Sequence, residues 1–300
     1  MKVLVTGAQG QLAKSLVERA QAHADVELIR AGRPQLDLAI PGRASEAIQA
    51  LRPDVVINAA AYTDVDRAEE EPELAFRINA DAAGEIARAA TVVGAPMIQI
   101  STDYVFDGRH HGPYTEDCEP NPIGAYGRSK LAGEKWVQAT TSRHAIVRTA
   151  WVFSPFARNF VKTMIGAART RDTLAVVDDQ IGSPSSALDL ADGLLRMAQL
   201  FVRSDGRGLG EVYHLAGTGQ TSWYGLADLV MAYCRKHSLP AARVRPIGTE
   251  DWPTSAKRPA NSVLDSTKFA RTFDFRMAHW EQSVEAVIAR LTGEQAENLR

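Results

Sequence analysis

Strand-like and helix-like patterns of apolar residues alternate through the first half of the chain. Short apolar, β-branched runs predict strands at residues 3–6, 26–29, 54–58, 96–101 and 145–148. Helical spacing of apolar positions predicts helices at residues 11–22 and 44–51, an acidic helical stretch from residue 64, an alanine-rich helix ending at residue 93, and a helix carrying Tyr126. This alternation predicts an α/β fold with a doubly wound (Rossmann) parallel sheet covered by helices on both faces.

The pattern changes near Trp151. Loops at residues 179–184 and 252–254 interrupt shorter helices and strands, and apolar positions at helical spacing predict a final helix at residues 279–291. We therefore expect residues 1–150 to form a dinucleotide-binding domain. Residues 151–300 should form a smaller substrate-binding subdomain that is interleaved with the first.

Composition narrows the possible partners. The 300 residues carry a formal net charge of −2 without a basic tract, which argues against nucleic acid as a partner. Cys118 and Cys234 are the only cysteines and lie far apart, so we predict neither a disulfide framework nor a zinc site, and a cytoplasmic location. The sequence also predicts neither a signal peptide nor a membrane span.

A glycine-containing turn follows the first strand directly and opens the first helix. Gly7, Gly10 and Ala13 have the spacing of a dinucleotide-binding turn, in which glycines allow backbone N–H groups to approach a pyrophosphate at the helix N-terminus. The alternative is an ordinary glycine-rich βα turn. The surrounding strand and helix favour dinucleotide binding.

Arginines occupy the end of the second strand, where an acidic residue would accept the ribose of NAD. Arg30 and Arg33 can instead pair with a 2′-phosphate, so we expect NADPH to be used at least as well as NADH. The alternative is that both arginines are simply solvated. Asp37 lies in the following loop, from which it can approach the adenosine, and Leu38 is assigned to the same cofactor site.

Tyr126 and Lys130 are four residues apart and therefore share one face of a helix. An ammonium beside the phenol is expected to bring the tyrosine pKa down from about 10, which suits a general acid in ketone reduction. The pair alone is common by chance, but it follows the fourth strand, whose end carries Ser101 and Thr102. We assign Thr102 a hydrogen bond to the reacting carbonyl, and Ser101 a cofactor or framework role.

An acidic cluster follows the third strand, comprising Asp64, Asp66, Glu69, Glu70, Glu71 and Glu73. Such a cluster can suggest cation binding. The sequence favours the solvated face and first turn of a helix, where acidic side chains suit the helix dipole.

These features resemble the extended short-chain dehydrogenase/reductase superfamily and, within it, the dTDP-4-dehydrorhamnose reductases. The resemblance is carried by residues 7–12, 56–63, 101–108 (Ser-Thr-Asp-Tyr-Val-Phe-Asp-Gly), 126–134 and 258–265. The glycine turn and the Tyr/Lys pair are common to the superfamily, whereas residues 102–108 and the Arg258-Pro259 segment are narrower signals. The resemblance covers essentially the whole chain. It implies reduction of the 4-keto group of dTDP-6-deoxy-L-lyxo-4-hexulose by NAD(P)H. Another nucleotide-sugar reductase or epimerase, or a non-catalytic regulatory subunit of this fold, is the alternative.

The resemblance also implies roles for individual residues. Thr102, Tyr126 and Lys130 would be catalytic, and the cofactor would contact Gly7, Gly10, Gln11, Leu12, Ala59, Ala60 and Ala61. The dTDP-sugar would contact Thr63, Val65, Trp151, Asn159, Gln180 and Arg258. Trp151 could instead be a core aromatic, and Arg258 could pair with a surface carboxylate.

Some members of this family are described as holding magnesium between subunits through glutamates. Ser15 and Leu188 stand at two of the corresponding positions here, and uncharged groups cannot replace carboxylate ligands of a hard cation. We therefore expect no metal, and a monomer or weak homodimer.

Overall fold

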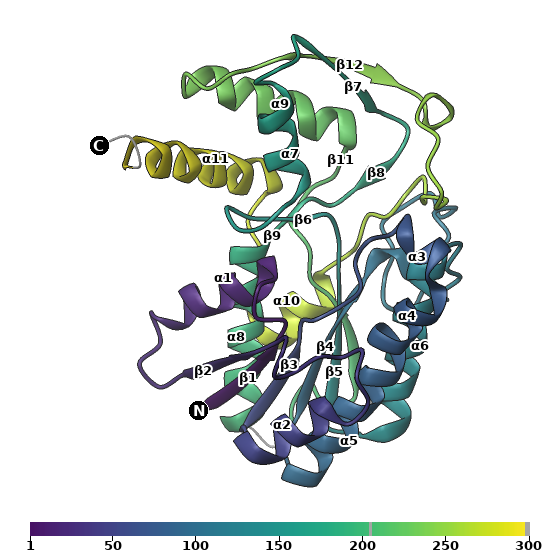
Figure 1. Cartoon of the computed structure of the whole chain (residues 1–300), viewed down its shortest axis with the longest axis vertical. Helices are drawn as coiled ribbons and strands as arrows, with labels where there is room; N and C mark the ends of the chain where they lie inside the picture. Colours follow the sequence, from purple (N-terminus) through teal and green to yellow (C-terminus); the bar gives the residue numbers. More distant parts are fainter. Residues whose placement is uncertain (204–205, 298–300) are drawn as a thin grey trace.

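The centre of the molecule is a six-stranded parallel sheet (Figure 1). The computed structural model describes residues 1–203 and 206–297. Along the sheet the strands run in the order β10 (Glu211–His214), β5 (His144–Thr149), β4 (Met97–Thr102), β3 (Val55–Asn58), β1 (Lys2–Thr6) and β2 (Glu27–Ala31). The predicted fold class is confirmed, and the five predicted strands differ from the observed ones by one or two residues at their ends.

Both faces of this sheet are buried, which explains the uninterrupted apolar runs. In β1, Val3 and Val5 pack into the core on one face, whereas Leu4 packs into the core on the other. The first face is covered by α1 (Gln11–Ala20), α8 (Ala187–Arg203) and α10 (Thr267–Phe273). The opposite face is covered by α2 (Arg43–Leu51), α5 (Ala82–Val93) and α6 (Ala125–Thr140).

Segments of the second half return to this sheet. Strand β10 pairs in parallel with β5. Helix α8 packs against α1 (Figure 1). The remaining second-half elements form a separate layer with its own apolar core, seen at the top of Figure 1. They include α7 (Phe160–Ala167), α9 (Trp223–Lys236), α11 (Trp280–Glu297) and the parallel pair β7 (Thr173–Val177) and β12 (Arg243–Ile247).

Short elements connect these layers near the carboxyl ends of the strands. The acidic stretch forms two short helices and a π-helical turn, α3 (Arg67–Glu70), α4 (Pro72–Phe76) and η1 (Arg77–Asp81), before α5. The other short elements are η2 (Asp103–Val105), η3 (Thr249–Asp251), β6 (Val152–Phe153), β8 (Ile181–Gly182), β9 (Ser185–Ser186) and β11 (Thr221–Ser222). Within the described residues, no helix has the length and apolar character that a membrane crossing requires.

Candidate active site

A cleft of about 1090 Å³ opens at the carboxyl ends of the central strands and extends to the second-half layer. This edge is where ligands bind in open parallel sheets. Most of the predicted site residues line it, namely Gly7, Gly10, Gln11, Leu12, Arg33, Asp37, Leu38, Ala59, Ala60, Ala61, Thr63, Val65, Ser101, Thr102, Tyr126, Lys130, Trp151 and Arg258. Arg30, Asn159 and Gln180 are not among its lining residues.

The glycine turn lies at one side of this cleft. Gly7 has φ of +90°, which favours glycine, and a Cβ there would lie 3.1 Å from the Cα of Ala60. A Cβ on Gly10 would meet only the carbonyl oxygen of Gly7, at 3.5 Å. The protein itself therefore leaves room beside Gly10, on the side from which a ligand can approach the backbone.

Helix α1 begins at Gln11 with its N-terminus at this turn. Gly10 is its N-cap residue, no side chain caps it, and the first turn holds no acidic residue in this fully described segment. The first N–H groups of a helix lack intrahelical partners and attract anions. This arrangement is suited to a pyrophosphate.

The two predicted 2′-phosphate ligands differ in position. Arg33 lines the cleft together with Asp37, whereas the Arg30 guanidinium donates a hydrogen bond to the carbonyl oxygen of Ala8, at 3.2 Å. Both arginine side chains are exposed. Arg33 is thus the better placed of the two for a cofactor phosphate.

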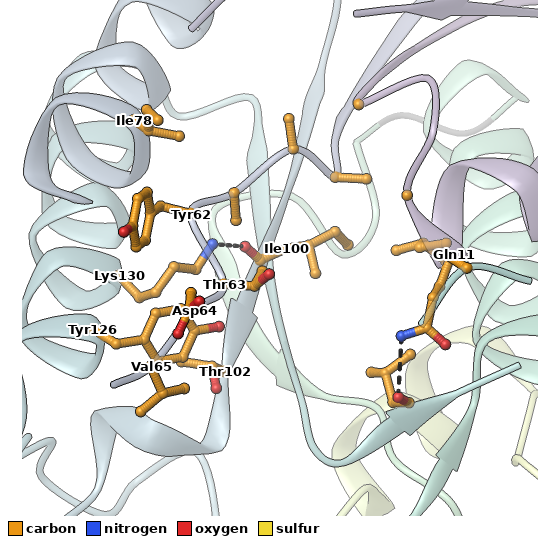
Figure 2. Close-up of a pocket in the computed structure, with 18 of the residues that line it drawn as sticks. Gln11, Tyr62, Thr63, Asp64, Val65, Ile78, Ile100, Thr102, Tyr126 and Lys130 are labelled. Atoms are coloured by element: carbon orange, nitrogen blue, oxygen red, sulfur yellow. Dashed lines mark hydrogen bonds between the residues drawn. The ribbon is translucent and has the colours of Figure 1, made fainter. Parts of the chain in front are cut away.

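Tyr126 lies at the start of α6 and faces the cleft beside Thr102 and Lys130 (Figure 2). Burial raises the pKa of Tyr126 above its usual value, and the hydroxyl of Thr102 opposes this shift only in part. The predicted lowering of the tyrosine pKa by Lys130 is therefore wrong for this structure. A phenol with a raised pKa is protonated at neutral pH, and this is the form that can donate a proton.

Lys130 is directed towards the end of β4. Its side chain is buried, and Nζ donates a hydrogen bond to the carbonyl oxygen of Ile100 at 2.6 Å (Figure 2). Burial lowers the pKa of Lys130 to about 8, and the carboxylate of Glu134 opposes that shift. The Lys130 ammonium is therefore bonded to the backbone of β4, and burial remains the main influence on the pKa of Tyr126.

Thr102 ends β4 and caps the short helix η2. Its Oγ1 donates to Oδ1 of Asp103 at 2.8 Å and accepts a hydrogen bond from the backbone N–H of Tyr104 at 3.2 Å. Burial raises the pKa of the Asp103 carboxyl to about 6. The Thr102 hydroxyl is thereby oriented within the cleft next to Tyr126.

Ser101 joins a buried ion pair behind the cleft. Its hydroxyl donates to Glu134 Oε1 at 2.5 Å, and the same carboxylate accepts two hydrogen bonds from Arg148, at 3.0 and 2.7 Å. The Glu134 and Arg148 side chains are 2% and 4% exposed. Helix α6 is thus fixed to the ends of β4 and β5, which favours the framework role for Ser101.

An aromatic pair also lines the cleft. Trp151 stacks on Trp223 with a centroid separation of 3.5 Å and an interplanar angle of 5°. A Cβ at Gly182 would lie 2.3 Å from the Trp151 ring, so glycine is required there. Trp151 is half-buried and lines the cleft. It therefore packs as a core aromatic does and also presents a surface to a ligand.

Arg258 reaches the cleft from the second half of the chain. Its Nη2 pairs with Asp66 at 2.6 Å, and its Nη1 donates to the hydroxyl of Tyr104 at 3.1 Å. The predicted alternative, pairing with a carboxylate, is therefore present, although Arg258 also lines the cleft.

Asn159 and Gln180 have structural partners instead. Asn159 caps α7 and donates to Gln11 Oε1 at 3.1 Å, while Gln180 donates to Thr249 at 2.9 Å. Gln11 also donates to the carbonyl oxygen of Val152 at 3.3 Å (Figure 2). The Gln11 side chain therefore joins the glycine turn to the second half.

Several lining residues received no role from the sequence. Asp103 and Tyr104 follow the predicted Thr102 directly, and this adjacency was the available signal. Trp223 and Arg158 reach the cleft only through the fold, and no local pattern distinguished them. Among the described residues, no group of three or more His, Cys, Asp and Glu side chains is arranged to hold a metal ion.

Comparisons with known proteins find similar chains that are named as reductases. A dTDP-4-dehydrorhamnose reductase of Sinorhizobium fredii is 42% identical over 288 residues, which cover 96% of this chain and 97% of that protein. The crystal structure of a dTDP-4-dehydrorhamnose reductase from Clostridium acetobutylicum matches with a TM-score of 0.89 and 38% identity, covering 97% of this chain and 99% of that chain.

A second solved structure bears on the cofactor. The dTDP-4-dehydrorhamnose reductase of Bacillus anthracis, in complex with NADP, matches with a TM-score of 0.88 and 35% identity, covering 96% of this chain and 99% of that chain. The predicted resemblance to these reductases is confirmed. The family model described as the RmlD substrate binding domain matches residues 1–292, and the chain therefore belongs to this family.

Proposed function

We propose that the chain is an NADPH-dependent oxidoreductase that reduces the 4-keto group of dTDP-6-deoxy-L-lyxo-4-hexulose to give dTDP-L-rhamnose. Its relatives carry the name dTDP-4-dehydrorhamnose reductase, and one of them was solved with NADP. The observation that carries the proposal is the protonated phenol of Tyr126, which shares one cleft with the glycine turn.

The residues present fit the cofactor. The uncapped N-terminus of α1 would hold the pyrophosphate, Arg33 the 2′-phosphate, and Ala59, Ala60 and Ala61 the adjoining part of the dinucleotide. When bound, the nicotinamide supplies the hydride. Lys130, with its ammonium fixed at the end of β4, would hold the ribose side of this site.

Tyr126 would donate the proton. During reduction the carbonyl oxygen gains negative charge and takes up one proton, and the protonated Tyr126 phenol lines the cleft. Thr102 would stabilise the developing charge by turning its hydroxyl hydrogen from Asp103 Oδ1, which accepts it in the structure, to the substrate oxygen. We place the sugar between these groups and Trp151, and the nucleotide towards Arg258.

The test is an assay of NADPH oxidation with a panel of 4-ketosugar nucleotides. We expect stoichiometric consumption of NADPH with the dTDP-linked substrate, and dTDP-L-rhamnose as the product identified by NMR. An epimerase or dehydratase would turn over substrate without net NADPH consumption. A regulatory subunit would bind nucleotides but show no turnover, and either result would refute the proposal.

We further propose that the protein acts in the cytoplasm as a monomer or weak homodimer that needs no metal. Light scattering across a concentration series would measure the mass, and turnover after treatment with EDTA should be unchanged.

A further inference from the structure

Helix α6, which carries Tyr126, begins without a cap from its own sequence. The helix starts at Ala125, and its N-cap residue, Gly124, has no side chain to accept a hydrogen bond from the first turn. Uncapped first turns leave backbone N–H groups unsatisfied and fray. Tyr126 is the second residue of this helix, so its position depends on how that turn is held.

A carboxylate from another helix supplies the missing cap. Oε1 of Glu69, in α3, accepts a hydrogen bond from the Ala125 backbone N–H at 2.7 Å. Oε2 of the same carboxylate lies 3.7 Å from Nη2 of Arg128, one turn into α6. A negative charge at this end of a helix is also favoured by the helix dipole.

Gly124 makes room for this contact. A Cβ at position 124 would lie 2.9 Å from Glu69 Oε1, closer than side chains normally approach. The backbone of Gly124, with φ −122° and ψ 164°, is extended and open to any residue. Glycine at this position therefore provides space for the carboxylate rather than an unusual backbone conformation.

The segment that carries Glu69 is itself anchored on both sides. Asp66 pairs with Arg258 and accepts the Ala256 N–H at 3.1 Å, and Glu71 accepts the Tyr62 hydroxyl at 2.8 Å. Three members of the acidic cluster thus have defined partners, although their side chains remain 38% (Asp66), 28% (Glu69) and 33% (Glu71) exposed, as the predicted solvated helix face implies. An anchored α3 can hold the start of α6 in a fixed place.

The apolar packing agrees with this arrangement. Ala68 of α3, Ala75 of α4 and Ala125 of α6 are buried together, and Tyr62 and Tyr126 pack against them. The ring of Tyr126 also meets Tyr104 edge-on at 5.6 Å. The first turn of α6 is therefore enclosed by groups that the acidic segment holds.

We propose that Glu69 is a positioning residue that caps the catalytic helix from α3 and so fixes the Tyr126 hydroxyl at the reacting carbonyl. This inference rests on the proposed role of Tyr126 as proton donor. Glu69 would touch neither cofactor nor substrate. Its contribution should therefore appear in the chemical step and not in cofactor binding.

The experiment compares Glu69→Ala with Glu69→Gln, which retains the accepting oxygen. We expect Glu69→Ala to lower kcat about tenfold with the Kd for NADPH unchanged, and Glu69→Gln to restore kcat to within about twofold of wild type. Glu70→Ala removes an exposed carboxylate from the same helix and is the matched control, with kcat unchanged.

Gly124→Ala is an independent way to remove the Glu69 cap from α6. The added methyl group should displace the Glu69 carboxylate and reproduce the loss in kcat, and the double variant Glu69→Ala/Gly124→Ala should be no worse than either single variant. Hydrogen exchange of the peptide that starts α6 should be faster in all of these variants except Glu69→Gln and Glu70→Ala.

Two outcomes would overturn the inference. One is an unchanged kcat in Glu69→Ala, and the other is an equal loss in Glu69→Ala and Glu69→Gln without faster exchange at the start of α6. Tyr126→Phe separates these results from a failure of the proposed function. If Tyr126→Phe keeps full turnover, the proton donor is misassigned, whereas the exchange measurement still reports whether Glu69 caps the helix.

Discussion

The two sides of the cleft present polar groups in different ways. The side formed by the glycine turn offers backbone N–H groups at the start of α1, next to a glycine with no side chain in the way. The side formed by β4 and α6 offers the side chains of Thr102, Tyr126 and Lys130. Thr102 is hydrogen-bonded to Asp103, and Lys130 to the carbonyl oxygen of Ile100. The first side is a product of local sequence, and the second is assembled from distant segments.

This difference suits two tasks. A pyrophosphate needs several donors and no proton transfer, which unpaired backbone groups supply without titrating. Proton donation needs a group whose pKa is set by its surroundings, and here burial sets that of Tyr126. We therefore expect substitutions on the two sides to affect binding and chemistry separately.

The largest effect on kcat is expected from a substitution on the side of the cleft formed by β4 and α6. Tyr126→Phe removes the proton donor while leaving the ring packing, so kcat should fall by about a thousandfold. The Kd for NADPH, measured by fluorescence titration, should stay within about twofold, because the glycine turn is untouched. A parallel weakening of cofactor binding would show that the two sides do not act separately.

The reverse separation is expected for Gly10→Asp. The new carboxylate would cap α1 and suit its dipole, so the protein should fold, but it would repel the pyrophosphate and raise the Kd for NADPH about 100-fold. Gly10→Asn has nearly the same size without the charge and is the matched control. If both variants bind NADPH equally weakly, size rather than charge is responsible.

The same contrast explains which features could be predicted from the sequence. The turn at Gly7 and Gly10 was predictable because strand, glycines and helix are consecutive. The sixth strand, β10, was not predicted because its pairing with β5 is a long-range contact of a short segment. Trp223 meets Trp151 only in the folded chain.

The chemistry of the side-chain side was only partly predictable. The spacing of Tyr126 and Lys130 correctly placed both at one cleft, but not where the ammonium would point. Spacing carries no information on burial, and burial decides the Tyr126 pKa. Likewise, the acidic cluster gave no sign that Glu69 would reach Ala125, which is 56 residues away.

Arg33 is the charged side chain that we assign to the 2′-phosphate of the cofactor. Arg33→Ala should raise the Kd for NADPH about tenfold and leave that for NADH nearly unchanged, because only NADPH carries the 2′-phosphate. Arg30→Ala should have a smaller effect, since its guanidinium is engaged by Ala8. If the Arg30→Ala/Arg33→Ala double variant binds NADPH as well as wild type, neither arginine reads that phosphate.

The smallest expected effect is a pH dependence of the free energy of unfolding, caused by a buried histidine near the ion pair of Glu134 and Arg148. Fully buried His214 lies behind the cleft near Arg148, and burial, followed by the Arg148 charge, lowers the pKa of His214 to about 3. Between about pH 6.5 and this value the unfolded chain binds the additional proton, so the free energy of unfolding decreases as pH falls through this window.

Urea denaturation at pH 7.5 and pH 5 would measure this contribution. From the linkage relation, wild type should lose about 2 kcal/mol more over this interval than His214→Gln, which has no ring to protonate. Taking the difference between the two proteins removes the opposite contribution of Asp103, whose raised pKa stabilises the fold as pH falls. Equal losses would mean that native His214 takes up a proton in this pH interval as readily as the unfolded chain does. Burial would then not lower the pKa of His214.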